Sequence, residues 1–255
     1  MSRKPNAAER VVAHRGYAAA YTENTPAAFE AAVQAGCRLV ECDIQLTADH
    51  VPVLLHDESL ARTFSRRQSI FELFSRDLSP AGSKSRTGAS GREALAGPPT
   101  LAAFLAWLAA EPEAEAFLEI KQESIARFGL DVVAAAVLSE LEKQPDSLTS
   151  RIVVISFQYD VLEPFHDAGF AIGCVLREKT RDSMAAARAL APEWLFYDIL
   201  KPGADALEAG PWKWCLYEIT SAGAVAGFRD RHDVYFETMQ VEKVRGELTA
   251  WDGHA

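Results

Sequence analysis

Apolar and polar positions alternate in short runs along almost the whole chain, and β-branched residues are frequent in the apolar runs. Runs of about four to eight such residues, bounded by polar segments, are typical of β-strands. We expect nine strands, at Val11–His14, Leu39–Leu46, Val51–His56, Phe117–Lys121, Ile152–Phe157, Ala171–Leu176, Trp194–Leu200, Trp214–Ile219 and Val234–Met239.

Helical patterns lie between these strands. The first has clear boundary signals, because Thr25 suits the N-cap, Pro26 suits the first helical position and Gly36 ends the pattern. We expect helices at Pro26–Ala35, Leu101–Ala109, Leu130–Lys143, Val161–Asp167, Ser183–Leu190, Gly223–Asp230 and Val241–Leu248. Strand–helix alternation of this kind predicts a parallel sheet that is covered by helices.

The number of strand–helix units indicates the fold class. About eight such units in 255 residues favour an α/β fold of the (β/α)8 TIM-type barrel over a doubly wound sheet. We therefore expect residues 1–255 to form a single barrel domain. No Gly-rich GxGxxG or Walker loop follows an expected strand, which argues against a nucleotide site.

One segment, at about residues 65–99, interrupts this alternation and is rich in Ser, Arg and Gly. A loop of this length inside a compact domain is usually functional or disordered. We interpret it as a small insertion after the second strand region. It is either a surface excursion or a cover over the barrel mouth, anchored by Phe71, Leu73 and Phe74, that sets the leaving-group preference.

The distribution of charge narrows the possible partners. The formal net charge is −10, and the basic residues are spread singly along the chain. Proteins that hold nucleic acid or an anionic membrane normally have a clustered basic face, so we expect neither partner. No run of about 18 apolar residues occurs, so we expect no transmembrane segment. An anionic small-molecule substrate would need a metal ion and a few fixed cations to meet its charge.

The cysteines and the N-terminus bear on the cellular compartment. Cys37, Cys42, Cys174 and Cys215 form no CxxC pair and are too sparse for a disulfide framework, so we expect reduced and mostly buried thiols. The polar stretch from Met1 to Arg10 lacks the apolar region of a secretory signal. Both features predict a cytoplasmic protein.

Two carboxylates on the second expected strand give the first chemical signal. Glu41 and Asp43 are two residues apart, so their side chains share one face while Val40 and Cys42 point to the other. Two buried carboxylates repel each other, and leaving them unpaired is costly. A hard divalent cation, Mg²⁺ or Ca²⁺, prefers oxygen ligands and would relieve this repulsion.

Further candidate residues lie at the ends of other strands. His14 and Arg15 close the first strand, His56 ends the third, and Glu119 and Lys121 alternate with apolar residues on the fourth. Barrel enzymes carry their catalytic residues at these carboxyl ends. Each residue also has a structural interpretation: a histidine can be a hydrogen-bonded strand end, and Arg15 and Lys121 could pair with the carboxylates in a salt-bridge network.

The order of these short motifs is more specific than any one of them. They are His14-Arg15-Gly16, Glu23-Asn24-Thr25, Gly36, Glu41-Cys42-Asp43, Thr47-Ala48-Asp49, Pro52-Val53, His56-Asp57, Leu60-Ala61-Arg62-Thr63, Pro99-Thr100-Leu101 and Glu119-Ile120-Lys121. The first half of the chain closely resembles the glycerophosphodiester phosphodiesterase family, and residues 154–176 resemble it moderately. The resemblance implies a (β/α)8 barrel with a small insertion after the His56 segment.

The resemblance also implies roles for seven residues. These are ligation of one divalent cation, Mg²⁺ or Ca²⁺, by Glu41, Asp43 and Glu119, acid–base catalysis by His14 and His56, and phosphate contacts from Arg15 and Lys121. The late strands depart from the family pattern of Trp-Thr-Val-Asn and a final Thr-Asp, with Tyr217-Glu218-Ile219-Thr220 and Glu237-Thr238 instead. These departures concern the substrate's alcohol group more than the chemistry.

We therefore expect metal-dependent hydrolysis of a glycerophosphodiester, a small-molecule substrate, to glycerol phosphate and an alcohol. The nearest alternative function is that of a lysophospholipase-D-like or sphingomyelinase-D-like enzyme, which would need an apolar groove for acyl chains. A sugar isomerase would need further metal carboxylates late in the chain, for which Glu218 and Glu237 are the candidates, and a non-catalytic phosphodiester-binding module is a third alternative. The sequence leaves open the metal, the preferred alcohol, the acid and base assignment of the histidines and the oligomeric state.

Overall fold

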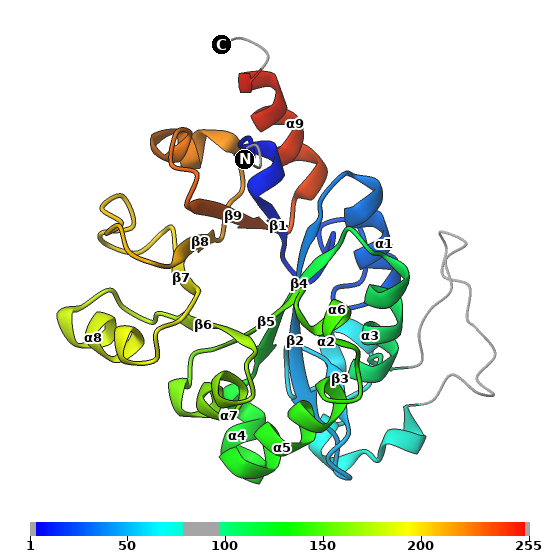
Figure 1. The fold of residues 1–255 in the computed structure, drawn as a ribbon. Helices are drawn as coiled ribbons and strands as arrows, with labels where there is room; N and C mark the ends of the chain where they lie inside the picture. The colour runs from blue at the N-terminus through cyan, green and yellow to red at the C-terminus, as the bar shows by residue number, and fades with distance from the viewer. Residues whose placement is uncertain (1–3, 79–96, 253–255) are drawn as a thin grey trace.

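Nine strands form one sheet that closes on itself (Figure 1). The computed structural model describes residues 4–78 and 97–252. The strands follow the order β1-β9-β8-β7-β6-β5-β4-β2-β3, and an additional pairing of β1 with β2 completes the ring. Their bounds are β1 Val11–Ala13, β2 Leu39–Leu46, β3 Pro52–Leu54, β4 Glu115–Ile120, β5 Ile152–Ser156, β6 Ala171–Val175, β7 Trp194–Asp198, β8 Lys213–Tyr217 and β9 Val234–Thr238.

Every pairing around the ring is parallel, so the eight ring strands present their carboxyl ends at the same mouth. This arrangement confirms the (β/α)8 TIM-type barrel expected from the strand–helix alternation. Inward side chains near the carboxyl ends of neighbouring strands therefore lie close together at this mouth.

Strand β3 corrects one expectation. The sequence pattern had placed the run ending in His56 among the parallel strands, but β3 pairs antiparallel with β2, with Leu54 opposite Ile44. Because β3 returns along the outer part of β2, the backbone N–H of Leu55 donates to the carbonyl of Asp43 at 3.0 Å. His56 therefore reaches the mouth through a hairpin. A run this short has no feature in its own sequence that fixes its direction.

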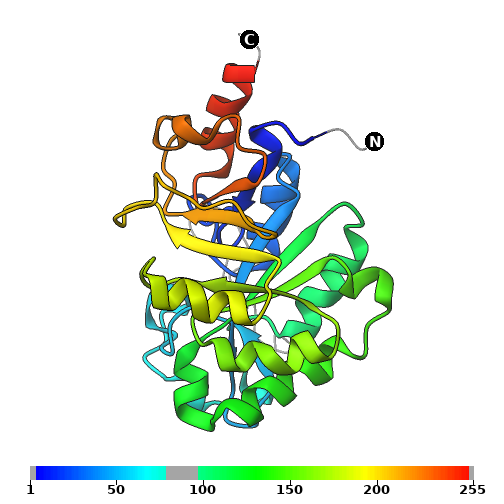
Figure 2. The ribbon, with the colours of Figure 1, turned by 60° about the vertical axis from the view of Figure 1, so that its left-hand side comes forward.

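Helices surround the ring on its outside, as the turned view also shows (Figure 2). The α-helices are α1 Pro26–Gln34, α2 Ala61–Phe64, α3 Leu101–Ala110, α4 Gln122–Phe128, α5 Leu130–Leu141, α6 Asp146–Thr149, α7 Glu163–Asp167, α8 Arg181–Ala189 and α9 Val241–Asp252. The 3-10 helices are η1 Ala8–Arg10, η2 Ile70–Glu72, η3 Ser75–Asp77, η4 Tyr159–Leu162 and η5 Ala222–Phe228. Helices α2, α4 and α6 were missed in the sequence, and η5 replaces the expected helix at 223–230.

The seven expected helical stretches otherwise coincide closely with observed helices. Helix α1 begins as predicted, because the Thr25 hydroxyl accepts a hydrogen bond from the backbone N–H of Ala28 at 3.3 Å. Within residues 4–78 and 97–252, no helix is both long enough and apolar enough to cross a membrane.

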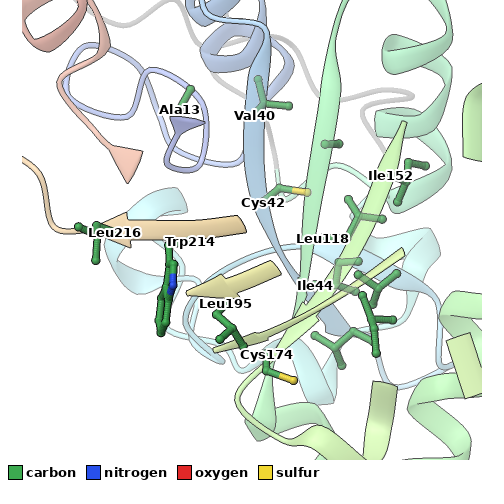
Figure 3. Close-up of a cluster of buried hydrophobic side chains, with 14 of the residues drawn as sticks. Ala13, Val40, Cys42, Ile44, Leu118, Ile152, Cys174, Leu195, Trp214 and Leu216 are labelled. Carbon is green, nitrogen blue, oxygen red and sulfur yellow. The ribbon is translucent and has the colours of Figure 1, made fainter. Parts of the chain in front are cut away.

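Side chains on the two faces of the strands form separate apolar regions. Outward residues of β2, such as Val40, Cys42 and Ile44, belong to the main core between sheet and helices (Figure 3). Inward residues form a second cluster, in which the ring of Phe117 lies 4.8 Å from that of Trp194. The barrel interior is therefore a packed core and not a pore. All four cysteines are buried and free, as expected.

The expected insertion is described only in part. Phe71 and Leu73 are buried and pack with Val53 and Leu60 in a small separate cluster, whereas Phe74, the third expected anchor, is 42% exposed. Residues 79–96, on which most of the predicted cover depends, lie outside the described residues. The prediction of a cover over the mouth therefore stays a prediction.

Gly173 of β6 provides a test of how tightly the barrel interior is packed. A Cβ at this position would lie 2.9 Å from Ile155 Cγ2 and 3.1 Å from Trp194 Cβ. We expect Gly173→Ala to lower the free energy of unfolding by about 1–3 kcal/mol, because the interior cannot accept the added volume. Thermal or urea unfolding measures this change.

The matched control is Gly246→Ala in helix α9, where an added Cβ meets nothing within 4 Å. This substitution should instead stabilise the protein by about 0.5–1 kcal/mol, because glycine is a poor residue inside a helix. Equal effects of the two substitutions would contradict tight interior packing at Gly173.

Candidate active site

A cavity of about 180 Å³ opens at the carboxyl ends of the strands, and five of the seven candidate residues line it. They are His14, Arg15, His56, Glu119 and Lys121. The rest of the lining is mostly apolar and aromatic, and consists of Ile155, Phe157, Val175, Phe196 and Tyr217 with the carboxylates Glu218 and Glu237. The structure thus brings these candidate residues together at one mouth, although His14 and Lys121 are 107 positions apart in the sequence.

Glu41 and Asp43, the other two candidates, are almost completely buried, with 2% and 0% of their surface exposed. The parallel register of β2 and β4 places Asp43 opposite Glu119. Carboxylate oxygens of Glu41, Asp43 and Glu119 lie within 4.8 Å of one another. The three expected metal ligands are therefore close enough to share one ion.

Asp43 is held by cations on both sides. The guanidinium Nε of Arg15 lies 3.1 Å from Oδ2 of Asp43, and the ammonium of Lys121 lies 3.2 Å from Oδ1. Burial by itself would raise the pKa of Asp43, but Lys121 and Arg15 lower it below its ordinary value. Lys121 also donates to Glu119 at 2.9 Å. The salt-bridge network considered from the sequence is therefore present around Asp43.

Glu41 is left out of this network. Its Oε2 accepts a hydrogen bond from the backbone N–H of Arg15 at 3.0 Å. Its Oε1 is buried and has no hydrogen-bond partner among the described residues. Burial and the neighbouring Asp43 raise the pKa of Glu41 well above its usual range. An unpaired carboxylate oxygen at this depth is costly, and a bound cation would remove the cost.

Glu237 of β9 adds a further carboxylate, which the sequence had indicated as a departure affecting the alcohol group and as a metal ligand only for an isomerase. It is 4% exposed, and its Oε1 lies 4.0 Å from Nε2 of His14. Glu237, His14 and Glu41 form a second group whose ligand atoms lie within 4.8 Å of one another. Burial and the charge of Glu119 raise the pKa of Glu237 to about 8. The signal in the sequence was its inward position on a strand of alternating pattern.

We call Glu41, Asp43, Glu119 and Glu237 the carboxylate cluster. When all groups are ionised, the four carboxylates exceed the two neighbouring cationic side chains, Arg15 and Lys121, by two negative charges. One divalent cation matches this excess, and carboxylate oxygens are the ligands that Mg²⁺ and Ca²⁺ prefer. The residues therefore fit such an ion both in charge and in donor type.

The loop after β1 contributes Asn24, which the sequence had indicated only as part of a motif. Its side-chain NH₂ donates to Oδ2 of Asp43 at 2.8 Å, and its carbonyl oxygen accepts from the Asp43 backbone N–H at 3.2 Å. Asn24 has φ of 56°, in the left-handed region that asparagine tolerates better than most residues. Asn24 thus fixes Asp43 from the side of this loop.

The two histidines have different surroundings. His14 follows β1, and its backbone N–H donates to the carbonyl of Thr238 on β9 at 3.0 Å. Burial together with Arg15 lowers the pKa of His14 to about 3, so its ring is neutral at neutral pH. His56 is more open to solvent, and its Nδ1 lies 2.7 Å from Oδ1 of Asp57. An ionised Asp57 can only accept, so Nδ1 of His56 carries the proton in this contact.

Comparison with known proteins connects the site to a family. A model described as the Glycerophosphoryl diester phosphodiesterase family matches residues 14–209. The Bacillus subtilis protein YqiK, described as uncharacterized, is 30% identical over 156 residues, which cover 60% of each chain. A glycerophosphodiester phosphodiesterase from Bacillus altitudinis is 46% identical over 54 residues, or 21% of this chain and 22% of the relative. The matched segments therefore span less than two thirds of either relative.

Solved structures share the fold over nearly the full chain. An Oleispira antarctica phosphodiesterase in complex with the product sn-glycerol-3-phosphate has a TM-score of 0.77 at 23% identity, covering 95% of this chain and 96% of that one. A glycerophosphodiester phosphodiesterase from Thermotoga maritima has a TM-score of 0.71 at 22% identity, covering 91% and 95%. At these identities the likeness shows a common barrel.

Removal of one charge from the carboxylate cluster should stabilise the metal-free protein. We expect Glu237→Gln to raise the melting temperature at neutral pH in the presence of a chelator. Burial and the charge of Glu119 raise the pKa of Glu237 to about 8, so the metal-free protein must protonate on folding a carboxyl that is ionised in the unfolded chain, and glutamine removes this cost. A relief of about 1 kcal/mol corresponds to about 2–4 °C in a chain of this size. Calorimetry with and without a divalent cation measures the shift, which should shrink when the cation is added.

The control is Glu30→Gln on the exposed face of α1. It changes the net charge by the same amount far from the cavity and should alter the melting temperature little. A lower melting temperature of metal-free Glu237→Gln would mean that Glu237 is favourably paired, contrary to this interpretation.

Proposed function

Because the chain belongs to the glycerophosphoryl diester phosphodiesterase family, we propose that it hydrolyses glycerophosphodiesters to glycerol phosphate and an alcohol. The observation that carries this proposal is one cavity lined by two histidines, an arginine and a lysine directly above buried carboxylates. Those groups suit a phosphodiester, whose negative charge needs cations and whose cleavage needs two proton transfers.

We assign the divalent cation, Mg²⁺ or Ca²⁺, to Glu41, Asp43 and Glu119. The buried Oε1 of Glu41, which has no partner among the described residues, supports this assignment. When bound, the ion would polarise the phosphoryl oxygens and stabilise the charge that develops on them. The pairing of Asp43 with Arg15 and Lys121 keeps that carboxylate ionised and available as a ligand.

Arg15 and Lys121 would bind the phosphate group from the two sides of Asp43. Both side chains line the cavity and both already contact carboxylates, which hold them in place before a substrate arrives. Asp43 and Glu119 raise the pKa of Lys121 above its ordinary value despite burial, so its ammonium stays charged. Fixed cations of this kind stabilise the transition state without reorganising.

His14 and His56 would transfer the two protons. One ring takes a proton from the nucleophile, which is water or a neighbouring hydroxyl of the substrate, as its oxygen bonds to phosphorus. The other ring gives a proton to the alcohol oxygen as its bond to phosphorus breaks. The contact of His56 Nδ1 with Asp57 leaves Nε2 of His56 free for this exchange. The product is a phosphomonoester, after hydrolysis of any cyclic intermediate.

The size of the cavity supports a small, deacylated substrate. Its volume of about 180 Å³ is below the roughly 300–1,000 Å³ of sites that hold drug-sized ligands. The apolar wall of Phe157, Val175 and Phe196 could contact the alcohol group. A lysophospholipase-D-like activity would need a longer apolar groove beyond this wall.

Two further proposals concern the chain as a whole. Four free and buried thiols support a cytoplasmic location, where thiols remain reduced. The closed ring supports a single domain over residues 1–255 with an insertion at about 65–99.

Metal removal provides the first test of the proposed function. We expect EDTA to abolish hydrolysis of glycerophosphodiesters and added Mg²⁺ or Ca²⁺ to restore it. Glu41→Gln, Asp43→Asn and Glu119→Gln should each lower kcat/KM by at least about 10²-fold, because each removes a charged ligand. The assay should compare deacylated glycerophosphodiesters, lysophospholipids and an aryl phosphodiester, with and without chelator.

Titration calorimetry of each variant with the metal ion, and its circular dichroism spectrum, separate lost binding from lost folding. Full activity after exhaustive chelation would refute metal dependence. Faster cleavage of lysophospholipids than of their deacylated forms would favour the lysophospholipase-D-like alternative.

Replacement of the histidines tests the acid–base pair. His14→Ala and His56→Ala should each lower kcat by about 10²–10⁴-fold, since each removes one proton transfer. An aryl diester with a good leaving group should recover much of the rate only in the variant that lacks the general acid. His166→Ala, on an exposed position of α7, is the control and should leave kcat unchanged. Near wild-type turnover of an alkyl diester by His56→Ala would rule out the pairing.

A further inference from the structure

A chain of ion pairs outside the cavity connects two residues that line it. His56 contacts Asp57, Asp57 contacts Arg62, Arg62 contacts Glu23, and Glu23 contacts Arg15. Its two ends are a proposed acid–base residue and a proposed phosphate-binding residue. The loop after β1 and the loop after β3 carry these ends, so Arg62 joins two segments that the barrel strands alone do not connect.

Arg62 fixes the carboxylate that contacts His56. Its Nε donates to Oδ2 of Asp57 at 2.7 Å, while Oδ1 of the same carboxylate lies 2.7 Å from His56 Nδ1. The hydrogen bond from Arg62 lowers the pKa of Asp57 to about 2. Asp57 thus stays ionised and can only accept, and each of its oxygens has one defined partner.

The other edge of the same guanidinium holds Glu23. The two terminal nitrogens of Arg62 donate to the two oxygens of Glu23 at 2.6 and 2.8 Å. Oε1 of Glu23 also accepts from a terminal nitrogen of Arg15 at 3.2 Å. The Nε of Arg15 lies 3.1 Å from Oδ2 of Asp43, so Asp43 and Glu23 hold the guanidinium of Arg15 from two directions.

We propose that Arg62 is a positioning residue, which holds the ring of His56 with its Nδ1 proton on Asp57 and holds Arg15 through Glu23. The proposal rests on the proposed function of His56 and Arg15. Arg62 lines no part of the cavity described above and is 48% exposed on its side chain. It therefore acts on the reaction through its two carboxylate partners and not by touching the substrate.

The geometry requires an arginine at this place. Three donors of one planar group serve two carboxylates at once, with a pair of parallel bonds to Glu23 and a single bond to Asp57. A lysine ammonium is a compact charge without this fork and does not reproduce the pattern. Exposed ion pairs usually add little stability, so the main effect of Arg62 is expected on orientation and not on folding.

Kinetics of matched variants test the proposal. Arg62→Ala should lower kcat on an alkyl glycerophosphodiester by about 10–100-fold, the scale expected for misplaced catalytic groups. Arg62→Lys should recover little of this loss, whereas added guanidinium ion at non-denaturing concentration should recover part of it in Arg62→Ala. Arg67→Ala, which removes an exposed arginine of the same loop, should leave kcat and the melting temperature unchanged.

A double-mutant cycle and a spectroscopic signal show whether Arg62 acts through Asp57. Arg62→Ala combined with Asp57→Asn should lose clearly less than the sum of the two single losses, because both remove the same support of His56 and only the effect through Glu23 is added. In proton NMR the hydrogen-bonded Nδ1 proton of His56 should give a downfield signal in the wild type and in Arg67→Ala. The signal should broaden or disappear in Arg62→Ala and Arg62→Lys.

The outcomes separate this inference from the proposed function. An inactive wild-type protein whose Nδ1 signal still depends on Arg62 would overturn the function and leave the positioning intact. An active wild type in which Arg62→Ala keeps both its turnover and the Nδ1 signal would overturn the inference alone. Additive losses in the double mutant, with an unchanged Nδ1 signal, would also overturn it, because Arg62 would then not act through Asp57.

Discussion

The repulsion between two buried carboxylates on the inner face of β2 governs the organisation of the whole site. Glu41 and Asp43 are taken out of water by the barrel, so each needs a positive or hydrogen-bonding partner. The chain supplies Asp43 with Arg15, Lys121 and Asn24, and it leaves one oxygen of Glu41 without a partner. This difference between the two carboxylates supports the proposal that a cation binds beside Glu41.

The loop after β1 supplies two of these partners at a cost in backbone strain. Arg15 and Asn24 both have φ of 56°, which non-glycine residues seldom adopt. Gly16 between them allows the tight approach to α1, since a Cβ there would lie 2.7 Å from the backbone of Ala28. The strain brings the Arg15 guanidinium and the Asn24 amide to the same oxygen of Asp43.

The hairpin of β2 and β3 places one of the two proposed acid–base residues near the buried carboxylates. Its antiparallel pairing carries His56 back to the mouth, where it lines the same cavity as His14, the residue that follows β1. We propose that these two rings transfer protons, and their positions follow from the strand register of the barrel and of one hairpin. The ion pairs outside the cavity then orient the more exposed of the two rings.

The sequence by itself predicted the barrel and the candidate residues that the structure brings together at its mouth. Apolar alternation marked the strands, and the two-residue spacing of Glu41 and Asp43 fixed a shared face, because side-chain direction in a strand depends only on local geometry. Only the tertiary structure decided the direction of β3, the entry of Glu237 into the carboxylate cluster and the link from Arg62 to Asp57 and Glu23. These depend on pairing and on contacts between residues distant in the chain, which no local pattern of residues specifies.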